Sequence, residues 1–305
     1  MRLSSAAPRG AGARAPRVAG ILLIAATIGC AGGATRPATT AEPQTPPIVV
    51  DTEHTPAAAG GLLADFDARF RVADQRARAI TYWLQCVPTV ARLRAGGNFG
   101  PAASAPRAIY CERTADGVPL AGVFDIDSSF RTVRRLQVVQ LDGARPRYLG
   151  PLDTARVAAG ASLARDVTRA LTPTWSRRNR PFSAVPIAGD GGALEVWAVP
   201  RANKARSYVT GGDVGYTRAA DGALAVLEDR STTWVQLNLA PSGPLTIYSS
   251  VRDVAAVADL VTARYHAELG RPVTVQTPAV VSALETGLDP ATGSRLVWKH
   301  TARTP

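Results

Sequence analysis

Apolar residues recur every three or four positions between Leu62 and Leu84, with acidic and Arg side chains between them. This spacing predicts an amphipathic helix that turns one face toward the core. Pro88 follows, and because proline disfavours continuation of a helix, we expect the helix to end near it. Two more helices are predicted at 153–171, before Pro173, and at 251–268, before Gly270.

Between these segments the apolar period changes to two, which is typical of half-buried strands. Pairs of alternating segments flank short Asp-Gly or Gly-rich turns, a pattern that predicts antiparallel hairpins rather than βαβ crossovers. The predicted pairs are 108–113 with 118–126, 135–141 with 147–149, 181–186 with 193–199, and 214–218 with 223–227. Further strands are expected at 233–239, 245–249, 273–285 and 295–300. The sequence therefore predicts the α+β class, with antiparallel β-hairpins and about three helices.

The first 29 residues have the composition of a secretory signal peptide. Residues 1–17 hold four Arg and no acidic residue, and an apolar run from Val18 to Gly29 follows. A spanning helix needs about 20 apolar residues, so this run is short for a bilayer. An uncleaved membrane anchor is the alternative.

The end of the apolar run, Thr27-Ile28-Gly29-Cys30, resembles the lipobox of bacterial lipoproteins. The resemblance implies that Cys30 is lipidated and becomes the mature N-terminus, although that family prefers Leu where this chain has Thr27. It also implies, because Ala31 follows the Cys, sorting to the outer membrane, with the protein facing the periplasm or the surface. Ordinary secretory cleavage after Ala34 is the alternative.

Residues 30–61 are rich in Pro, Thr, Ala and Gly and lack apolar periodicity, so we expect a flexible tether behind the lipidated Cys30. Residues 62–301 are then left to form an α+β globular domain. A division of this domain into two halves near 172–180 is an open alternative.

The formal net charge of +11 suggests a nucleic-acid partner at first sight. Only two of the 35 basic residues are Lys, which leaves 33 Arg in an Ala-, Gly- and Pro-rich chain typical of a GC-rich genome. Removal of residues 1–29 takes away four Arg, so the mature charge is 31 − 24 = +7. Export makes nucleic acid an unexpected partner. The basic runs around 131–135, 177–180 and 201–206 are either solvated loops or attracted to an anionic membrane surface.

Cys86 and Cys111 are the two cysteines of the predicted globular domain. Cys86 is expected at the end of a helix and Cys111 in a strand. An even pair in an exported protein predicts a disulfide, here one that joins helix to sheet. Two buried free thiols are the alternative. No metal site is expected, because neither cysteine has another Cys or a His at ligand spacing.

Catalytic signatures such as Gly-x-Ser-x-Gly or His-Glu-x-x-His do not occur in the sequence. His266 is expected at a helix C-terminus, where the helix dipole favours it, and His300 at the surface. Asp125 and Asp127 could act as paired carboxylates, but a solvated strand end is the simpler interpretation.

Gly211, Gly212 and Asp213 form the candidate ligand-binding segment, because glycine lets a ligand approach the main chain. The segment opens a strand rather than a helix, so the helix-dipole logic of phosphate binding does not apply. A backbone turn or bulge is the alternative.

These features favour an exported, lipid-anchored and non-catalytic binding domain of the cell envelope. Its expected partners are a membrane, through the lipid, and an envelope protein or small ligand, and we expect no cofactor. One alternative is an envelope hydrolase that uses Asp125, Asp127, Asp213 or His266. The other is an assembly subunit that uses exposed strand edges.

Overall fold

The computed structural model describes residues 56–97, 107–113, 119–127, 129, 132–140, 147–149, 154–204, 206–240, 242–249, 254–287 and 296–303. All of them belong to one compact unit, Val50–Pro305. The predicted signal peptide, the lipidation site Cys30 and most of the tether lie outside the described residues. The domain boundaries therefore stay predictions.

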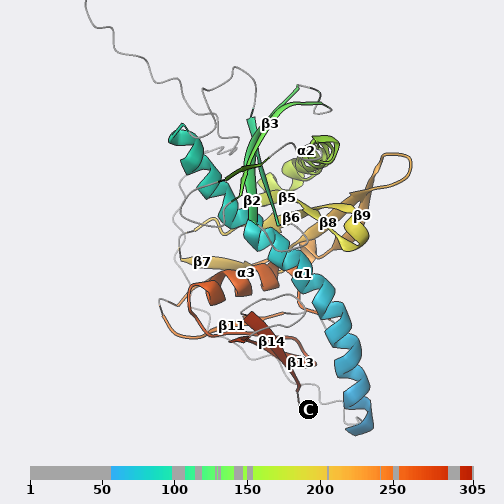
Figure 1. Cartoon of the computed structure of the whole chain (residues 1–305). Helices are drawn as coiled ribbons and strands as arrows, with labels where there is room; N and C mark the ends of the chain where they lie inside the picture. The colour runs from blue at the N-terminus through green and yellow to red at the C-terminus, as the bar shows by residue number, and fades with distance from the viewer. Residues whose placement is uncertain are drawn as a thin grey trace, which may run out of the picture. The chain divides into compact units, whose positions relative to one another are not determined.

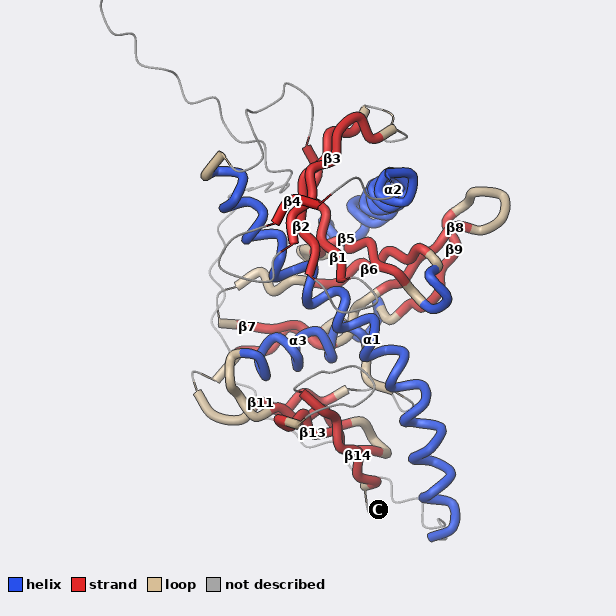
Figure 2. The backbone as a smooth tube through the Cα atoms, viewed as in Figure 1, coloured by secondary structure: helices blue, strands red, loops and turns tan. Residues whose placement is uncertain are grey.

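The described chain has the predicted α+β architecture, with three α-helices and mostly antiparallel sheets (Figures 1 and 2). The helices are α1 (Pro56–Ala95), α2 (Thr154–Arg177) and α3 (Val257–Glu268). One sheet has the order β1 (Arg107–Arg113), β2 (Pro119–Ile126), β3 (Val133–Gln140), β4 (Arg147–Leu149). A second has the order β5 (Phe182–Ala188), β6 (Leu194–Pro200), β8 (Val214–Arg218), β9 (Leu224–Asp229). A third has the order β11 (Leu245–Tyr248), β12 (Val273–Gln276), β13 (Val280–Thr286), β14 (Leu296–Ala302).

All four predicted hairpins are confirmed: β1 pairs with β2, β3 with β4, β5 with β6 and β8 with β9, each antiparallel. The turn residues favour these pairings because they bring neighbouring segments together locally. A two-stranded ribbon of β7 (Ser207–Thr210) and β10 (Val235–Asn238) completes the sheets; β7 was not predicted.

The C-terminal sheet corrects two expectations. β11 and β12 are parallel, and α3 connects them as a crossover of the βαβ kind that the hairpin pattern had argued against. The predicted strand 273–285 is broken at Thr277, whose hydroxyl accepts the N–H of Val280 at 3.0 Å and turns the chain back as β13.

Both predicted helix ends at proline were wrong. α1 continues through Pro88 and α2 through Pro173. Each proline side chain is exposed, and a fully or nearly fully buried residue follows it: Val90 in α1 and Trp175 in α2. Tertiary packing beyond each proline holds the last turn in place, which outweighs the missing backbone hydrogen bond.

α3 begins at Val257, whereas the prediction began it at 251; residues 254–256 are buried but not helical. Helix α1 packs against α3, β1, β5 and β14. The Cys86–Cys111 disulfide is present, with a Cα–Cα distance of 6.1 Å, and it joins α1 to β1 as predicted. No helix among the described residues is long and apolar enough to cross a bilayer.

Candidate functional site

Gly211 and Gly212 lie in the turn between β7 and β8, with φ of +60° and +81°. A Cβ on Gly211 would lie 2.2 Å from the hydroxyl oxygen of Thr233, and one on Gly212 would lie 2.6 Å from the Trp234 ring. Both the backbone conformation and the close packing therefore require glycine here. The backbone turn given as the alternative interpretation is present, and the segment is buried.

Asp213 follows the two glycines in the β7–β8 turn. Its side chain is fully buried and lies beside the first residue of helix α3, Val257. One of its carboxylate oxygens accepts the N–H of Val257 at 3.2 Å, while the other has no partner in the described part of the chain. The N-cap residue Ala256 cannot supply a side-chain acceptor, so an acid from a distant loop caps this helix.

Asp259, in the first turn of α3, receives three hydrogen bonds. They come from the N–H of Gly211 at 2.8 Å, the Ser249 hydroxyl and the N–H of Ala256. The carboxylate therefore ties the β7–β8 turn and the end of β11 to its own helix start. An acid at this position also interacts favourably with the helix dipole.

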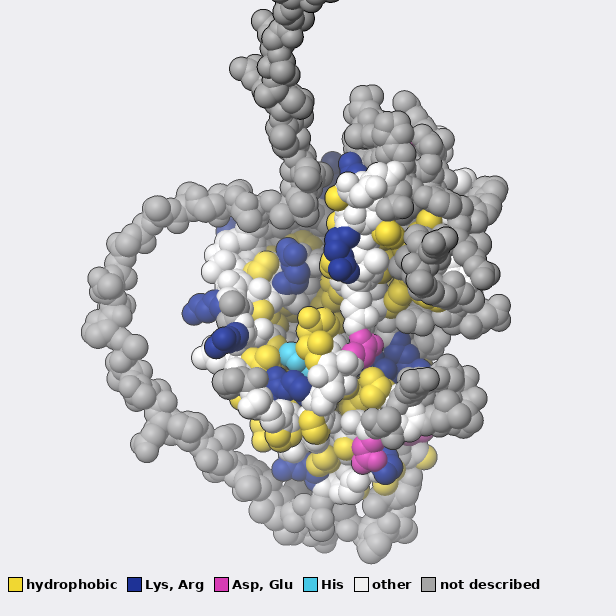
Figure 3. Space-filling model, turned by 60° about the vertical axis from the view of Figure 1, so that its left-hand side comes forward, with side chains coloured by type: hydrophobic (Ala, Val, Ile, Leu, Met, Phe, Trp, Pro, Cys, Tyr) yellow, Lys and Arg dark blue, Asp and Glu magenta, His cyan; other side chains and the backbone are white. Residues whose placement is uncertain are grey.

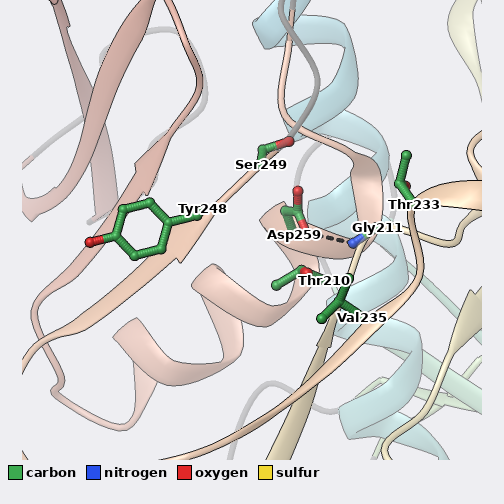
Figure 4. Close-up of a pocket in the computed structure, with 7 residues that line it drawn as sticks. All are labelled: Thr210, Gly211, Thr233, Val235, Tyr248, Ser249 and Asp259. Carbon is green, nitrogen blue, oxygen red and sulfur yellow. Dashed lines mark hydrogen bonds between the residues drawn. The ribbon is translucent and has the colours of Figure 1, made fainter. Parts of the chain in front are cut away.

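A small pocket of about 70 Å³ lies over this carboxylate (Figure 4). The pocket is lined by Thr210, Gly211, Thr233, Val235, Tyr248, Ser249 and Asp259. Thr210 and Asp259 come from different elements but converge on the same space, whereas the Tyr248 ring points away from it. Hydroxyl and carboxylate groups share the wall with apolar atoms, so the pocket suits a small group that carries hydrogen-bond donors beside an apolar part.

Burial raises the pKa of both acids. The pKa of Asp213 rises to about 7 because burial disfavours the charged form and the nearby Asp259 and Glu228 carboxylates oppose it, while Arg230 acts against the rise. The pKa of Asp259 rises to about 6, also through burial, and its three hydrogen bonds oppose that rise.

Arg230 connects the two sides of the site. Its backbone N–H donates to the Asp213 carbonyl at 2.9 Å, and its guanidinium donates to the carbonyl of Val254 at 2.9 Å and to Glu228. The cation therefore lies near both acids, although its guanidinium donates to other acceptors.

The other predicted acids lie elsewhere. Asp125 is buried in β2. Asp127 accepts the Ser129 hydroxyl at 2.8 Å, and its N–H donates to the Thr132 carbonyl, so it organises the β2–β3 turn. Among the described residues, no group of three or more His, Cys, Asp or Glu side chains could hold a metal ion.

The two histidines of the body do not join the site either. His266 is at the end of α3 as expected, and it is buried, which lowers its pKa. His300 is not at the surface as predicted: its ring packs edge-on against Phe66 and Phe70, and its Nδ1 lies 2.8 Å from the Ser282 hydroxyl. Inward orientation of alternate residues in β14 explains the difference.

Sequence reasoning singled out the glycine turn but not Ser249, Thr233 or the role of Asp259. Asp259 carries the one usable signal, since it is an acid within the apolar run 254–261. Ser249 and Thr233 carry none, because they reach the pocket only through tertiary packing. Comparisons of the chain with protein-family models, with curated proteins and with solved structures found no match.

Proposed function

We propose that this chain is an exported, lipid-anchored protein of the cell envelope whose globular domain binds a ligand or an envelope partner. The Cys86–Cys111 disulfide is the observation that carries the proposal. Disulfides persist in oxidising compartments such as the periplasm and are rare in the cytosol. The signal-like residues 1–29 and the lipobox-like Thr27–Cys30 supply the route and the anchor.

Binding fits the pocket better than catalysis does. An acyl-transfer enzyme needs free N–H donors at the position where negative charge develops. Here the N–H of Gly211 donates to Asp259 and the N–H of Gly212 donates to the Arg230 carbonyl at 3.1 Å and to Thr233. The donors of the glycine turn therefore stabilise the fold, and the remaining lone pair of Asp259 is left for a ligand.

Lipidation is tested on the full chain expressed in a bacterium with two membranes. Mass spectrometry of the purified wild type is expected to find Cys30 as the first residue, carrying acyl chains. Cys30→Ser is expected to retain residues 1–29 and to lack acyl chains. Cys86→Ser/Cys111→Ser, which removes the disulfide and leaves Cys30 in place, is expected to remain acylated. An unmodified N-terminus downstream of Cys30 would overturn the anchor.

Ligand binding is tested by NMR titration with methylammonium chloride against sodium chloride at equal ionic strength. We expect shifts of the Gly211 and Asp259 amides with methylammonium alone. Thr210→Val, which removes a lining hydroxyl that makes no hydrogen bond to the described part of the chain, is expected to weaken the shifts while preserving the fold. Equal responses to both salts would count against a donor-binding pocket.

A hydrolase is the second candidate, because the Ser249 hydroxyl donates to Asp259 in the manner of a nucleophile beside a base. A fluorophosphonate probe distinguishes the two functions. Covalent labelling that Ser249→Ala abolishes would favour the hydrolase, whereas unlabelled protein with an intact ammonium response supports the binding domain.

A further inference from the structure

Two basic runs that are distant in the sequence meet at one end of the β5–β6 pair. Phe182 lies opposite Pro200 at this end of the antiparallel register, so the loops before β5 and after β6 emerge together. The N–H of Arg201 donates to the Pro181 carbonyl at 2.8 Å. The side-chain amide of Asn203 donates to the Asn179 carbonyl at 3.3 Å. These contacts join the loops into one surface.

Five exposed cations lie on these two loops and at the end of α2 that leads into the first of them. Together they form what we call the cationic surface: Arg177, Arg178, Arg201, Lys204 and Arg206. None of the five forms an ion pair within the described part of the chain, and segments 174–182 and 200–210 contain no acidic residue. Arg180, by contrast, lies over the Trp234 ring at 4.9 Å and donates to the Ser231 carbonyl, so it stabilises the fold.

The backbone conformation of the two loops supports a binding role for these side chains. Asn179 and Arg206 have φ of +51° and +56°, and they are the two non-glycine residues with positive φ in the described chain. Asn adopts this conformation readily, whereas a long side chain at such a position is uncommon. Arg206 is thus a cation at a position where glycine would be less strained, which points to a function for its guanidinium.

We propose that the cationic surface lies against the anionic phosphate headgroups of the membrane that anchors the chain. This inference rests on the proposed lipid anchor, which would keep the domain near that membrane. Guanidinium groups pair with phosphate through two parallel hydrogen bonds. An exposed surface built from two loops fits a field of headgroups, and none of its residues lines the pocket over Asp259.

The charge distribution agrees with this partner. Among the described side chains on the face shown in Figure 3, Lys and Arg are spread among hydrophobic residues and acidic ones are few. A protein with a net charge of +7 after removal of residues 1–29 would approach an anionic bilayer readily. The five cations of the cationic surface would then set its orientation. Each basic residue near such a surface contributes roughly a fivefold gain in affinity.

The test places the full chain, with its native N-terminus, in nanodiscs. The nanodiscs contain either phosphatidylcholine alone or phosphatidylcholine with about 30 mol % of the anionic lipid phosphatidylglycerol. Hydrogen exchange is then followed in segments 177–181 and 201–206. We expect exchange in these segments to slow at least about fivefold with the anionic lipid and to return to the neutral-lipid rate in about 1 M salt, which screens exposed charges. Equal exchange in the two lipids would overturn the proposal.

The variant Arg178→Glu/Arg201→Glu/Lys204→Glu is expected to lose the protection. The matched control, Arg92→Glu/Arg94→Glu/Arg169→Glu, reverses three other exposed cations and is expected to keep it. Loss of protection in both variants would reduce the effect to net charge and overturn a defined surface. Protection by inorganic phosphate or by an oligonucleotide with neutral nanodiscs would assign the surface to a small anion or to nucleic acid instead.

Mass spectrometry of the same sample keeps the two proposals separate. Acylated Cys30 with no lipid-dependent protection contradicts the cationic surface but leaves the anchor intact. If Cys30 carries no lipid, the chain is added to free vesicles of the same compositions. Sedimentation with anionic vesicles alone, lost in the triple variant, then supports the surface without the anchor, and no sedimentation overturns it.

Discussion

Gly211 and Gly212 hold the β7–β8 turn in left-handed backbone conformations beside Thr233 and Trp234. We expect Gly211→Ala to lower the free energy of unfolding by about 2–4 kcal/mol, because the new methyl group meets both backbone strain and the Thr233 side chain and carbonyl. Urea unfolding followed by circular dichroism measures this change.

Gly222→Ala is the matched control for Gly211→Ala. Gly222 also has a positive φ of +84°, but nothing lies within 4 Å of a Cβ built on it. Its substitution adds strain without a clash, so we expect a loss of only about 1 kcal/mol. Equal losses at the two glycines would show that packing around the β7–β8 turn contributes nothing.

The buried pair Asp213 and Asp259 predicts how stability depends on pH. Both pKa values are raised in the folded protein, to about 7 and about 6, above the value near 3.9 of an unfolded Asp. The folded state therefore binds protons more tightly, and the free energy of unfolding should fall as pH rises from about 4 to about 7. Unfolding in urea at several pH values measures this slope.

Asp213→Asn keeps an acceptor for the N–H of Val257 and removes one buried charge. We expect it to flatten the pH slope and to stabilise the protein near neutral pH by on the order of 1–3 kcal/mol. Asp221→Asn removes an exposed carboxylate and controls for net charge. A slope that Asp213→Asn leaves unchanged would contradict a role for this pair.

The turn glycines were visible in the sequence, whereas their partners were not. A Gly-Gly-Asp run is a local signal for a tight turn. Asp259 is 48 residues away from Gly211, and no local pattern relates the two. The pocket depends on where β11 and α3 place Ser249 and Asp259, and this placement is a property of the tertiary fold.

At the scale of elements, the hairpins could be predicted from local sequence, whereas the crossover depends on tertiary packing. Short turns such as Asp221-Gly222 bring their flanking strands together, so local sequence was sufficient to predict β8 with β9. β11 and β12 are separated by α3, and their parallel pairing depends on how that helix packs on the sheet. Nothing within either strand records the pairing.

The last turn of α2, beyond Pro173, is expected to depend on tertiary packing, and a substitution can test this. Trp175 is buried two residues after Pro173 and packs edge-on against Phe182 at 4.9 Å between ring centroids. We expect Trp175→Ala to destabilise the protein by about 3–5 kcal/mol and to release the last turn of α2. Hydrogen exchange of residues 174–177 would report that release.

The neighbouring Thr174 is exposed, and Thr174→Ala serves as the control. We expect this substitution to change the free energy of unfolding by less than about 0.5 kcal/mol and to leave exchange in the last turn as it was. An α2 helix that keeps its slow exchange after Trp175→Ala would mean that local propensity holds the turn beyond Pro173.

At the scale of the molecule, α1 links elements that have no sheet in common. Its Arg76 donates two hydrogen bonds to Glu195 of β6, and its Cys86 is bonded to Cys111 of β1. The disulfide closes a loop with a sequence separation of 25 residues. We expect Cys86→Ala/Cys111→Ala to lose about 3–4 kcal/mol in the chain-entropy view, measured by urea unfolding. An equally stable double variant would contradict this.

Asp74 of α1 is the centre of a second link, between α1, α3 and β14. Its carboxylate accepts two hydrogen bonds from Arg264, at 2.6 and 2.5 Å, and one from the Trp298 indole at 2.8 Å. Arg78, one turn along α1, donates a further hydrogen bond to it at 2.9 Å. The Asp74 and Arg264 side chains are only 5% and 4% exposed. Removal of the acid would leave a buried guanidinium without its counter-charge, which is far more unfavourable than the loss of a surface pair.

We therefore expect Asp74→Asn to lower the free energy of unfolding by about 3–5 kcal/mol, as measured in urea. Asp65→Asn is the control on the same helix, because Asp65 pairs with Arg69 at 2.6 Å but its side chain is 66% exposed, and we expect less than about 1 kcal/mol there. Asp74→Asn/Arg264→Met removes both charges and should recover part of the loss. If Asp74→Asn and Asp65→Asn lower the free energy of unfolding equally, the buried ion pair does not hold α1 against α3, and apolar packing alone must do so.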